Sequence, residues 1–104
     1  MIKVSVMYPN NEGSTFDMKY YCETHIPMVR RKLGAALKGV AVEQGISAEE
    51  PGSPAPYLAL CHLLFESVEA FQIAFGPHAE EFERDIPNYT DTQPTIQISE
   101  VKQV

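Results

Sequence analysis

Hydrophobic and polar side chains alternate at the start of the chain. In residues 2–8 every second side chain is apolar or aromatic, and the positions between them are polar or flexible. A period of two is typical of a β-strand with one buried face. The residues on the predicted inner face are Ile2, Val4, Val6 and Tyr8. A strand is also predicted for residues 39–45, and the last strand for residues 95–101.

A helical period follows the first strand. Apolar residues recur at spacings of four, four, three and four, which places them on one stripe of an α-helix. The members of this stripe are Met18, Cys22, Ile26, Val29 and Leu33. Ser14 or Thr15 is predicted to cap the start of the helix, with Asp17 in its first turn, and Gly34 or Gly39 to end it.

The second half of the chain contains a strand that is apolar on both faces. This strand, YLALCHLLF, spans residues 57–65 and follows a proline-rich loop at residues 46–56. Ser67 is predicted to cap a short helix, which Gly76 and Pro77 interrupt. One or two further helical turns are expected in HAEEFERDI, before an irregular segment that leads into the last strand.

The predicted order of elements is strand, helix, strand, strand, helix, strand. In a single domain covering residues 1–104, this βαββαβ order is typical of the ferredoxin-like α+β fold, an antiparallel four-stranded sheet with two helices on one face. Two helices cover one side of the sheet, yet residues 57–65 are apolar on both sides. We therefore predict a homodimer through the sheet faces with a barrel-like interior. The alternative is a monomer with an unusually apolar central strand.

Charge is distributed unevenly along the chain. The formal net charge is -6, and residues 49–91 hold nine acidic side chains against one base, Arg84. Nucleic acids and anionic membranes need a basic surface, so this distribution argues against both as partners. No stretch approaches the roughly 20 apolar residues of a membrane span. The N-terminus has the pattern of a strand rather than of a signal peptide, so we expect a cytoplasmic protein.

The sequence contains few features that would bind a cofactor. Cys22 and Cys61 lack metal-like spacing and are expected to be reduced core residues. The histidines do not form a pattern typical of metal ligands. A glycine-rich phosphate loop and a nucleophile elbow are both missing, so we expect no nucleotide, flavin or metal. Any catalysis would then depend on a general base, an apolar pocket and hydrogen-bond donors.

Three segments of the chain resemble the EthD family. The first is FDMKYYCETHIPMV, in which an aromatic-Asp pair precedes two tyrosines and a His-x-Pro motif. The others are PYLALCHLLFES and AFGPHAEEFERDIPNYTDTQPTIQISEV, so the resemblance covers nearly the whole chain. It implies a dimeric α+β barrel. It also implies kinship with small bacterial proteins named for an ethyl tert-butyl ether degradation cluster, and with cofactor-free monooxygenases and cyclases of similar fold.

His25 is the first candidate catalytic residue. A helical wheel places it beside the apolar stripe, near Met18 and Val29. Pro27 removes a backbone donor, and a kink there would set the imidazole over a cavity between helix and sheet. An imidazole with a pKa of about 6.5 suits a general base at neutral pH. The alternative is a half-buried histidine bonded to a strand or loop, with the proline bending the helix around the core.

Tyr21 and His62 are the other candidate catalytic residues. Tyr21 lies next to His25 on the wheel and offers an apolar ring with a donor tip, although it could equally pack under a loop. If its face of the strand meets the helices, His62 points at the same layer as His25 and could relay a proton. The alternative is a core histidine bonded to a backbone carbonyl. Asp85 and Tyr89 bracket a loop that could cover the cavity or carry dimer contacts, and we expect it to be an ordered structural loop.

Three functions fit these observations. The first is a cofactor-independent oxidoreductase or cyclase for a small hydrophobic, oxygenated or aromatic molecule, with His25 as base and Tyr21 or His62 as donor to an oxyanion. The second is a non-catalytic accessory protein that carries a hydrophobic metabolite for a separate oxidase. The third is a structural dimerisation module. An open cavity with His25 and a second convergent polar group favours the first, an open cavity with His25 alone the second, and a filled interior the third.

Overall fold

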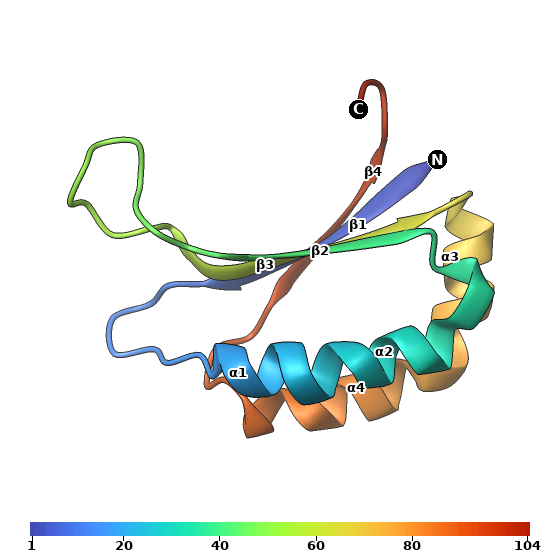
Figure 1. The fold of residues 1–104 in the computed structure, drawn as a ribbon, viewed down its shortest axis with the longest axis horizontal. Helices are drawn as coiled ribbons and strands as arrows, with labels where there is room; N and C mark the ends of the chain where they lie inside the picture. The colour runs from blue at the N-terminus through green and yellow to red at the C-terminus, as the bar shows by residue number, and fades with distance from the viewer.

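The computed structural model describes residues 1–104 as one antiparallel four-stranded sheet with helices packed beneath one of its faces (Figure 1). The strand order is β2-β3-β1-β4, which confirms the ferredoxin-like α+β prediction. The strands are β1 Ile2–Pro9, β2 Gly39–Gln44, β3 Tyr57–Phe65 and β4 Thr95–Glu100. The α-helices are α1 Met18–Tyr20, α2 Ile26–Leu33, α3 Val68–Phe75 and α4 Ala79–Asp85.

The face of the sheet that meets the helices is the one that the alternation in β1 predicts. Val4 pairs with Leu63 and Val6 pairs with Cys61 across the two central strands. These inward side chains form the core together with the buried residues of the helices. The opposite face has no helix over it (Figure 1). The alternation of β3 nevertheless places leucines on that face. Those leucines, Leu58, Leu60 and Leu64, are only partly buried.

The first helix contains a π-helical segment, Tyr21–His25, between α1 and α2. Within it the N–H of Ile26 donates to the carbonyl of Tyr21, five residues earlier. Pro27 follows at once, in the first turn of α2, where its missing N–H is best tolerated. The predicted kink is therefore realised as a π-turn, a local widening of the helix that is often found at functional sites.

The π-turn changes which residues face the core. Because it holds one more residue than an α-turn, the buried stripe before it moves by one position. Tyr21 and His25 are buried, whereas Cys22 is exposed. The prediction that both cysteines lie in the core is therefore wrong for Cys22 and confirmed for Cys61.

The helix boundaries follow local capping chemistry. Asp17, rather than Ser14 or Thr15, caps α1 by accepting a hydrogen bond from the N–H of Tyr20. Ser67 caps α3 as predicted, through the N–H of Ala70. A 3₁₀ turn at Gly76–His78 separates α3 from α4, which is the predicted interruption. No helix in the chain is both long enough and apolar enough to cross a membrane.

Candidate active site

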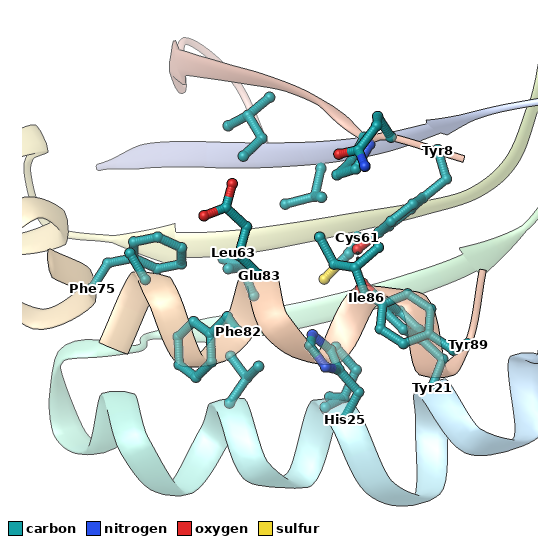
Figure 2. A pocket seen from close by; sticks show the side chains of 17 residues that line it. Tyr8, Tyr21, His25, Cys61, Leu63, Phe75, Phe82, Glu83, Ile86 and Tyr89 are labelled. Atoms are coloured by element: carbon teal, nitrogen blue, oxygen red, sulfur yellow. Dashed lines mark hydrogen bonds between the residues drawn. The ribbon is translucent and has the colours of Figure 1, made fainter. Parts of the chain in front are cut away.

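A cavity of about 270 Å³ lies between the inner face of the sheet and the helices (Figure 2). Its walls come from β1 and β3 above, the π-helical segment and α2 on one side, and α4 with the following loop on the other. Of the 17 lining residues, 13 are hydrophobic, so the few polar groups stand out. The cavity is therefore suited to a small apolar molecule held in place by a few hydrogen bonds.

His25 lies on the helical wall of this cavity, with its ring directed toward the sheet (Figure 2). The residue is 5% exposed. Its Nδ1 lies 2.8 Å from Oδ2 of Asp85, a residue at the end of α4. Nε2 makes no hydrogen bond within the protein. Every fully buried side-chain nitrogen or oxygen does have a hydrogen-bond partner, so Nε2 is not fully buried. This nitrogen is therefore open to the cavity.

Asp85 is held in place by two further donors. Its Oδ1 accepts a hydrogen bond from the hydroxyl of Tyr20 and another from the side-chain amide of Asn88, each at 2.8 Å. Partial burial opposes ionisation, but the hydrogen bonds from Asn88, His25 and Tyr20 outweigh it and lower the pKa of Asp85. The carboxylate therefore accepts the Nδ1 proton of His25, which leaves the lone pair on Nε2.

The protonation of His25 follows from its burial. Desolvation lowers the pKa of His25 below its ordinary value, although the hydrogen bond to Asp85 and the charge of that carboxylate work in the opposite direction. At neutral pH the imidazole is thus uncharged, oriented by Asp85, and has a free lone pair in an apolar cavity. These are the physical requirements of a general base.

Three tyrosines line the cavity beside the imidazole. The hydroxyls of Tyr8 and Tyr89 lie 2.7 Å apart, and both residues are almost completely buried. The ring of Tyr21 stacks on His25 with centroids 5.3 Å apart, and the ring of Tyr89 lies 4.8 Å from it. Burial raises the pKa of all three phenols. They therefore remain protonated and serve as hydrogen-bond donors.

Cys61 also faces the cavity, from β3 (Figure 2). Burial raises the pKa of its thiol to about 11, although a hydrogen bond with Tyr21 and the positive charge of Arg30 act against that rise. A thiol in this state is a small apolar wall group rather than a nucleophile. The chain holds no cluster of three histidine, cysteine or carboxylate side chains arranged around a metal-sized site.

His62 lies on the other face of the sheet, so the condition under which it would point at the same layer as His25 is not met. Along β3 the side chains alternate, and Cys61 occupies the helix-facing side. His62 instead bonds Ser5 through Nδ1 at 2.8 Å and lies 3.3 Å from Glu43 through Nε2. The alternative hypothesis, that His62 is a core histidine bonded to a backbone carbonyl, is not observed either, because both of its partners are side chains.

Tyr21 and His25 line one cavity, and three further residues contribute to the site. Asp85 and Tyr89 are expected from the sequence in an ordered structural loop, with a place over the cavity as one alternative, yet Asp85 ends α4 and both residues contact the candidate base. Tyr8 was recognised only as an inward-facing strand residue. A signal for Tyr8 was present in its position at the end of the apolar face of β1. The pairing of Asp85 with His25, 60 residues away in sequence, has no local signal.

Comparison with known proteins places this architecture in a class. The profile of the EthD domain matches residues 13–93. An EthD-like protein of known structure from Ralstonia eutropha JMP134 is 44% identical, with a TM-score of 0.91, over 98% of this chain and 94% of that one. The chain therefore belongs to the EthD family, which confirms the resemblance seen in its sequence. No curated protein matches the sequence.

Two more distant structures share the fold. An ethyl tert-butyl ether degradation family protein from Bacillus halodurans C-125 has 19% identity and a TM-score of 0.67, over 97% of this chain and 98% of that one. A proposed antibiotic biosynthesis monooxygenase from Bordetella bronchiseptica has 16% identity and a TM-score of 0.61, over 98% and 97%. At these identities the likeness extends to the fold alone. The chain is thus a small protein of the EthD family with a ferredoxin-like α+β fold.

Proposed function

We propose that this chain is a cofactor-independent general-base enzyme that acts on a small hydrophobic, oxygenated molecule, as a monooxygenase-like oxidoreductase or as a cyclase. The observation that carries the proposal is the 2.8 Å bond between His25 Nδ1 and Asp85 beside an apolar cavity. It fixes the imidazole with Nε2 directed at the space where a substrate would lie. A base so arranged performs proton abstraction without any other reactive group.

The first step in this mechanism is removal of an acidic proton from the substrate by Nε2 of His25. The C–H or O–H bond breaks, its electron pair stays on the substrate, and the proton moves to the imidazole. Asp85 then faces an imidazolium, and the resulting ion pair stabilises the product of the transfer. Tyr21 and its neighbouring phenols donate hydrogen bonds to the oxygen on which the negative charge develops.

The substrate anion has two chemical outcomes in a site of this kind. It can react with dioxygen at a CH₂ carbon, so that one oxygen atom becomes a carbonyl oxygen and the other leaves as water with the two hydrogens of that carbon, the substrate itself being the reductant. Alternatively, it can add to a carbonyl of the same molecule in an aldol-type cyclisation. Both need only a base, oxyanion donors and an apolar enclosure. The chemical identity of the substrate decides between them.

The convergence of polar groups favours an enzyme over a carrier. A carrier of a hydrophobic metabolite needs an apolar cavity, but it gains nothing from a buried histidine held by a carboxylate. Such a pair costs free energy through desolvation. The tyrosine hydroxyls at the same cavity are also more polar than an apolar cargo requires. A purely structural module is disfavoured because the interior is not filled.

We propose further that the functional unit is a homodimer joined through the outer sheet faces. That face carries the partly buried leucines of β3 and Met7 of β1, with no helix over them (Figure 1). Uncovered apolar side chains on one side of an antiparallel sheet favour burial against a second surface. A second copy is an economical cover, because it supplies a matching face by symmetry.

The base assignment can be tested before the natural substrate is known. The probe is an aryl methyl ketone in D₂O, whose methyl protons exchange for deuterium when a base removes them. We expect the wild-type protein to accelerate this exchange and His25→Ala to lower the acceleration by about 10²–10⁴-fold, the usual contribution of a general base. Proton NMR measures the exchange rate directly.

His78→Ala is the matched control, because His78 is the histidine outside both polar clusters and does not line the cavity. Circular dichroism establishes that each variant is folded. Exchange at the wild-type rate in folded His25→Ala protein would show that this imidazole is not the base. Equal losses in both variants would have the same meaning.

A further inference from the structure

The side chains that line the cavity are either acidic or uncharged. No lysine or arginine lines it, and the only lining carboxylate is that of Glu83. Behind His25 lies the ionised Asp85, whose pKa is lowered. A ligand that arrives as an anion therefore meets negative charge with no cation in the cavity wall to pair with it, because Arg30, whose charge acts on Cys61, does not line the cavity. Desolvation of the anion adds to that cost. A neutral ligand meets neither penalty.

The site can nevertheless hold an anion that forms inside it. If a neutral acid gives its proton to Nε2 of His25, the imidazolium and Asp85 together become a neutral pair. The negative charges that remain at the cavity are then those of the ligand and of Glu83. The net charge of the site with its ligand does not change during the transfer. The cavity thus distinguishes a neutral weak acid from the salt of a strong one, even when the two resulting anions have similar shapes.

The Tyr8 and Tyr89 pair is placed to receive that charge. Their hydroxyls are 2.7 Å apart, so one of the two protons is used in the bond between them. The other proton is not needed by this bond and can be donated to a ligand oxygen. Tyr89 also packs against the ring of His25, at 4.8 Å between centroids, which keeps the donor and the base on the same side of the cavity.

We infer that the cavity selects neutral phenols and enols and binds them as their anions, with the ligand oxygen on the Tyr8–Tyr89 hydroxyl pair and its proton on His25. This inference rests on the proposed role of His25 as a base. In the transfer the ligand O–H bond breaks, an Nε2–H bond forms, and the electron pair stays on the ligand oxygen. The aromatic and aliphatic walls bury the remaining ring of the ligand.

The experiment compares two probes that share one ring, 4-nitrophenol and 4-nitrobenzoate. The absorbance of 4-nitrophenol distinguishes the neutral phenol from the phenolate. The protein is added at a pH below the pKa of free 4-nitrophenol. We expect it to raise the phenolate fraction, which corresponds to an apparent pKa of the bound probe at least about one unit lower than that of the free probe. We expect 4-nitrobenzoate, a carboxylate at the same pH, to bind at least about tenfold more weakly, as measured by calorimetry.

The contribution of the tyrosine pair is measured with Tyr8→Phe and Tyr89→Phe, which remove one hydroxyl each. Each variant removes a hydrogen bond to the charged oxygen of the phenolate, so we expect its affinity for the phenolate to fall about tenfold or more. Tyr57→Phe is the control, because Tyr57 does not line this cavity. If one of the two pair variants fails to fold, the other still tests the inference.

Several results would overturn the inference. The first is that 4-nitrophenol binds as the neutral phenol. The second is that 4-nitrobenzoate binds as tightly as 4-nitrophenol. The third is that the phenolate fraction is unchanged in both Tyr8→Phe and Tyr89→Phe when both are folded. The failure of the base itself is recognised separately. If His25→Ala retains the full phenolate signal, His25 is not the proton acceptor, and the proposed function fails along with this part of the inference. If ketone exchange depends on His25 but the probe results fail, the base stands and only the ligand class is wrong.

Discussion

A histidine lies beside a carboxylate on each side of the sheet, in opposite surroundings. On the helix side, His25 and Asp85 are 2.8 Å apart, both largely buried, beside an apolar cavity. On the outer face, His62 lies 3.3 Å from Glu43, whose side chain is 54% exposed. Both histidines have the same intrinsic chemistry. Enclosure and a fixed partner, rather than residue type, therefore make His25 a candidate base.

The outer pair has a different physical role available to it. His62 bridges Ser5 of β1 and Glu43 of β2, so it links the two strands that flank β3. In the proposed homodimer, this polar group would lie among leucines at the interface. A satisfied polar group in an apolar interface can fix the register of the two partners, a role that needs no reactive nitrogen.

The largest expected effect comes from charging the outer face. In Leu60→Glu, each copy would place a carboxylate in the proposed interface, next to Glu43 of the adjacent strand. Because an unpaired buried charge is costly, we expect the dissociation constant of the dimer to rise by at least about 100-fold. Analytical ultracentrifugation measures it. Ile73→Glu is the control, because Ile73 is 69% exposed on α3, away from this face. A compact wild-type monomer at micromolar concentration would refute the dimer.

The second-largest effect is expected when the carboxylate beside each histidine, Asp85 or Glu43, is replaced by its amide. Asp85→Asn removes the charge that holds His25, and Glu43→Gln makes the same change on the outer face. We expect Asp85→Asn to lower the ketone exchange rate by about 10–100-fold, since the imidazole becomes a weaker and less oriented base. The acidic limb of the pH–rate profile should move to lower pH, because Asp85 raises the pKa of His25. Glu43→Gln should leave both unchanged, and a comparable loss in this variant would show that enclosure does not distinguish the pairs.

The third effect tests the shift of the buried stripe by the π-turn. Cys61→Ser places a hydroxyl in the buried inner face and should lower the free energy of unfolding by about 1–3 kcal/mol. Cys22→Ser changes an exposed side chain and should alter it by less than about 0.5 kcal/mol. Urea unfolding followed by circular dichroism measures both. A larger loss of unfolding free energy in Cys22→Ser than in Cys61→Ser would indicate that Cys22 is buried, as the uninterrupted helical stripe predicts.

Much of the fold could be predicted because its signals are local. The alternation in β1, the cap at Ser67 and the break at Gly76 each depend on a few neighbouring residues. The π-turn was not predicted, because apolar periodicity assumes a constant number of residues per turn. Pro27 marked the position of the irregularity, but a kink and a π-turn give the same sequence signal.

The candidate site was predicted in part, for a related reason. His25 and Tyr21 were found from their positions on one helix. The face of His62 was left conditional, because the pattern of β3 is apolar on both sides and does not say which side meets the helices. Asp85 and Tyr89 reach the cavity through tertiary packing between α4 and the first helix. Sequence spacing carries no information about such contacts.

The smallest expected effect is a pH dependence of the free energy of unfolding that arises from His25 and Asp85. The pKa of His25 is lowered in the folded protein from its ordinary 6.5, so just below that pH the unfolded chain binds more protons. The free energy of unfolding should therefore fall as the pH drops from about 6.5 toward the folded pKa, by at most about 1.4 kcal/mol per pH unit for one proton. Urea unfolding between neutral and mildly acidic pH measures this slope.

Variants of the inner pair separate its two titrations. His25→Gln keeps a polar side chain but cannot take up a proton, so it should flatten the slope in the upper window. The lowered pKa of Asp85 acts in a distinct window, where stability is lost as the pH falls from the ordinary value of 3.8 through the folded pKa. Asp85→Asn should remove that second loss. An unchanged upper slope in His25→Gln would mean that burial of this imidazole does not suppress its protonation, and enclosure would then not account for the neutral state proposed for His25.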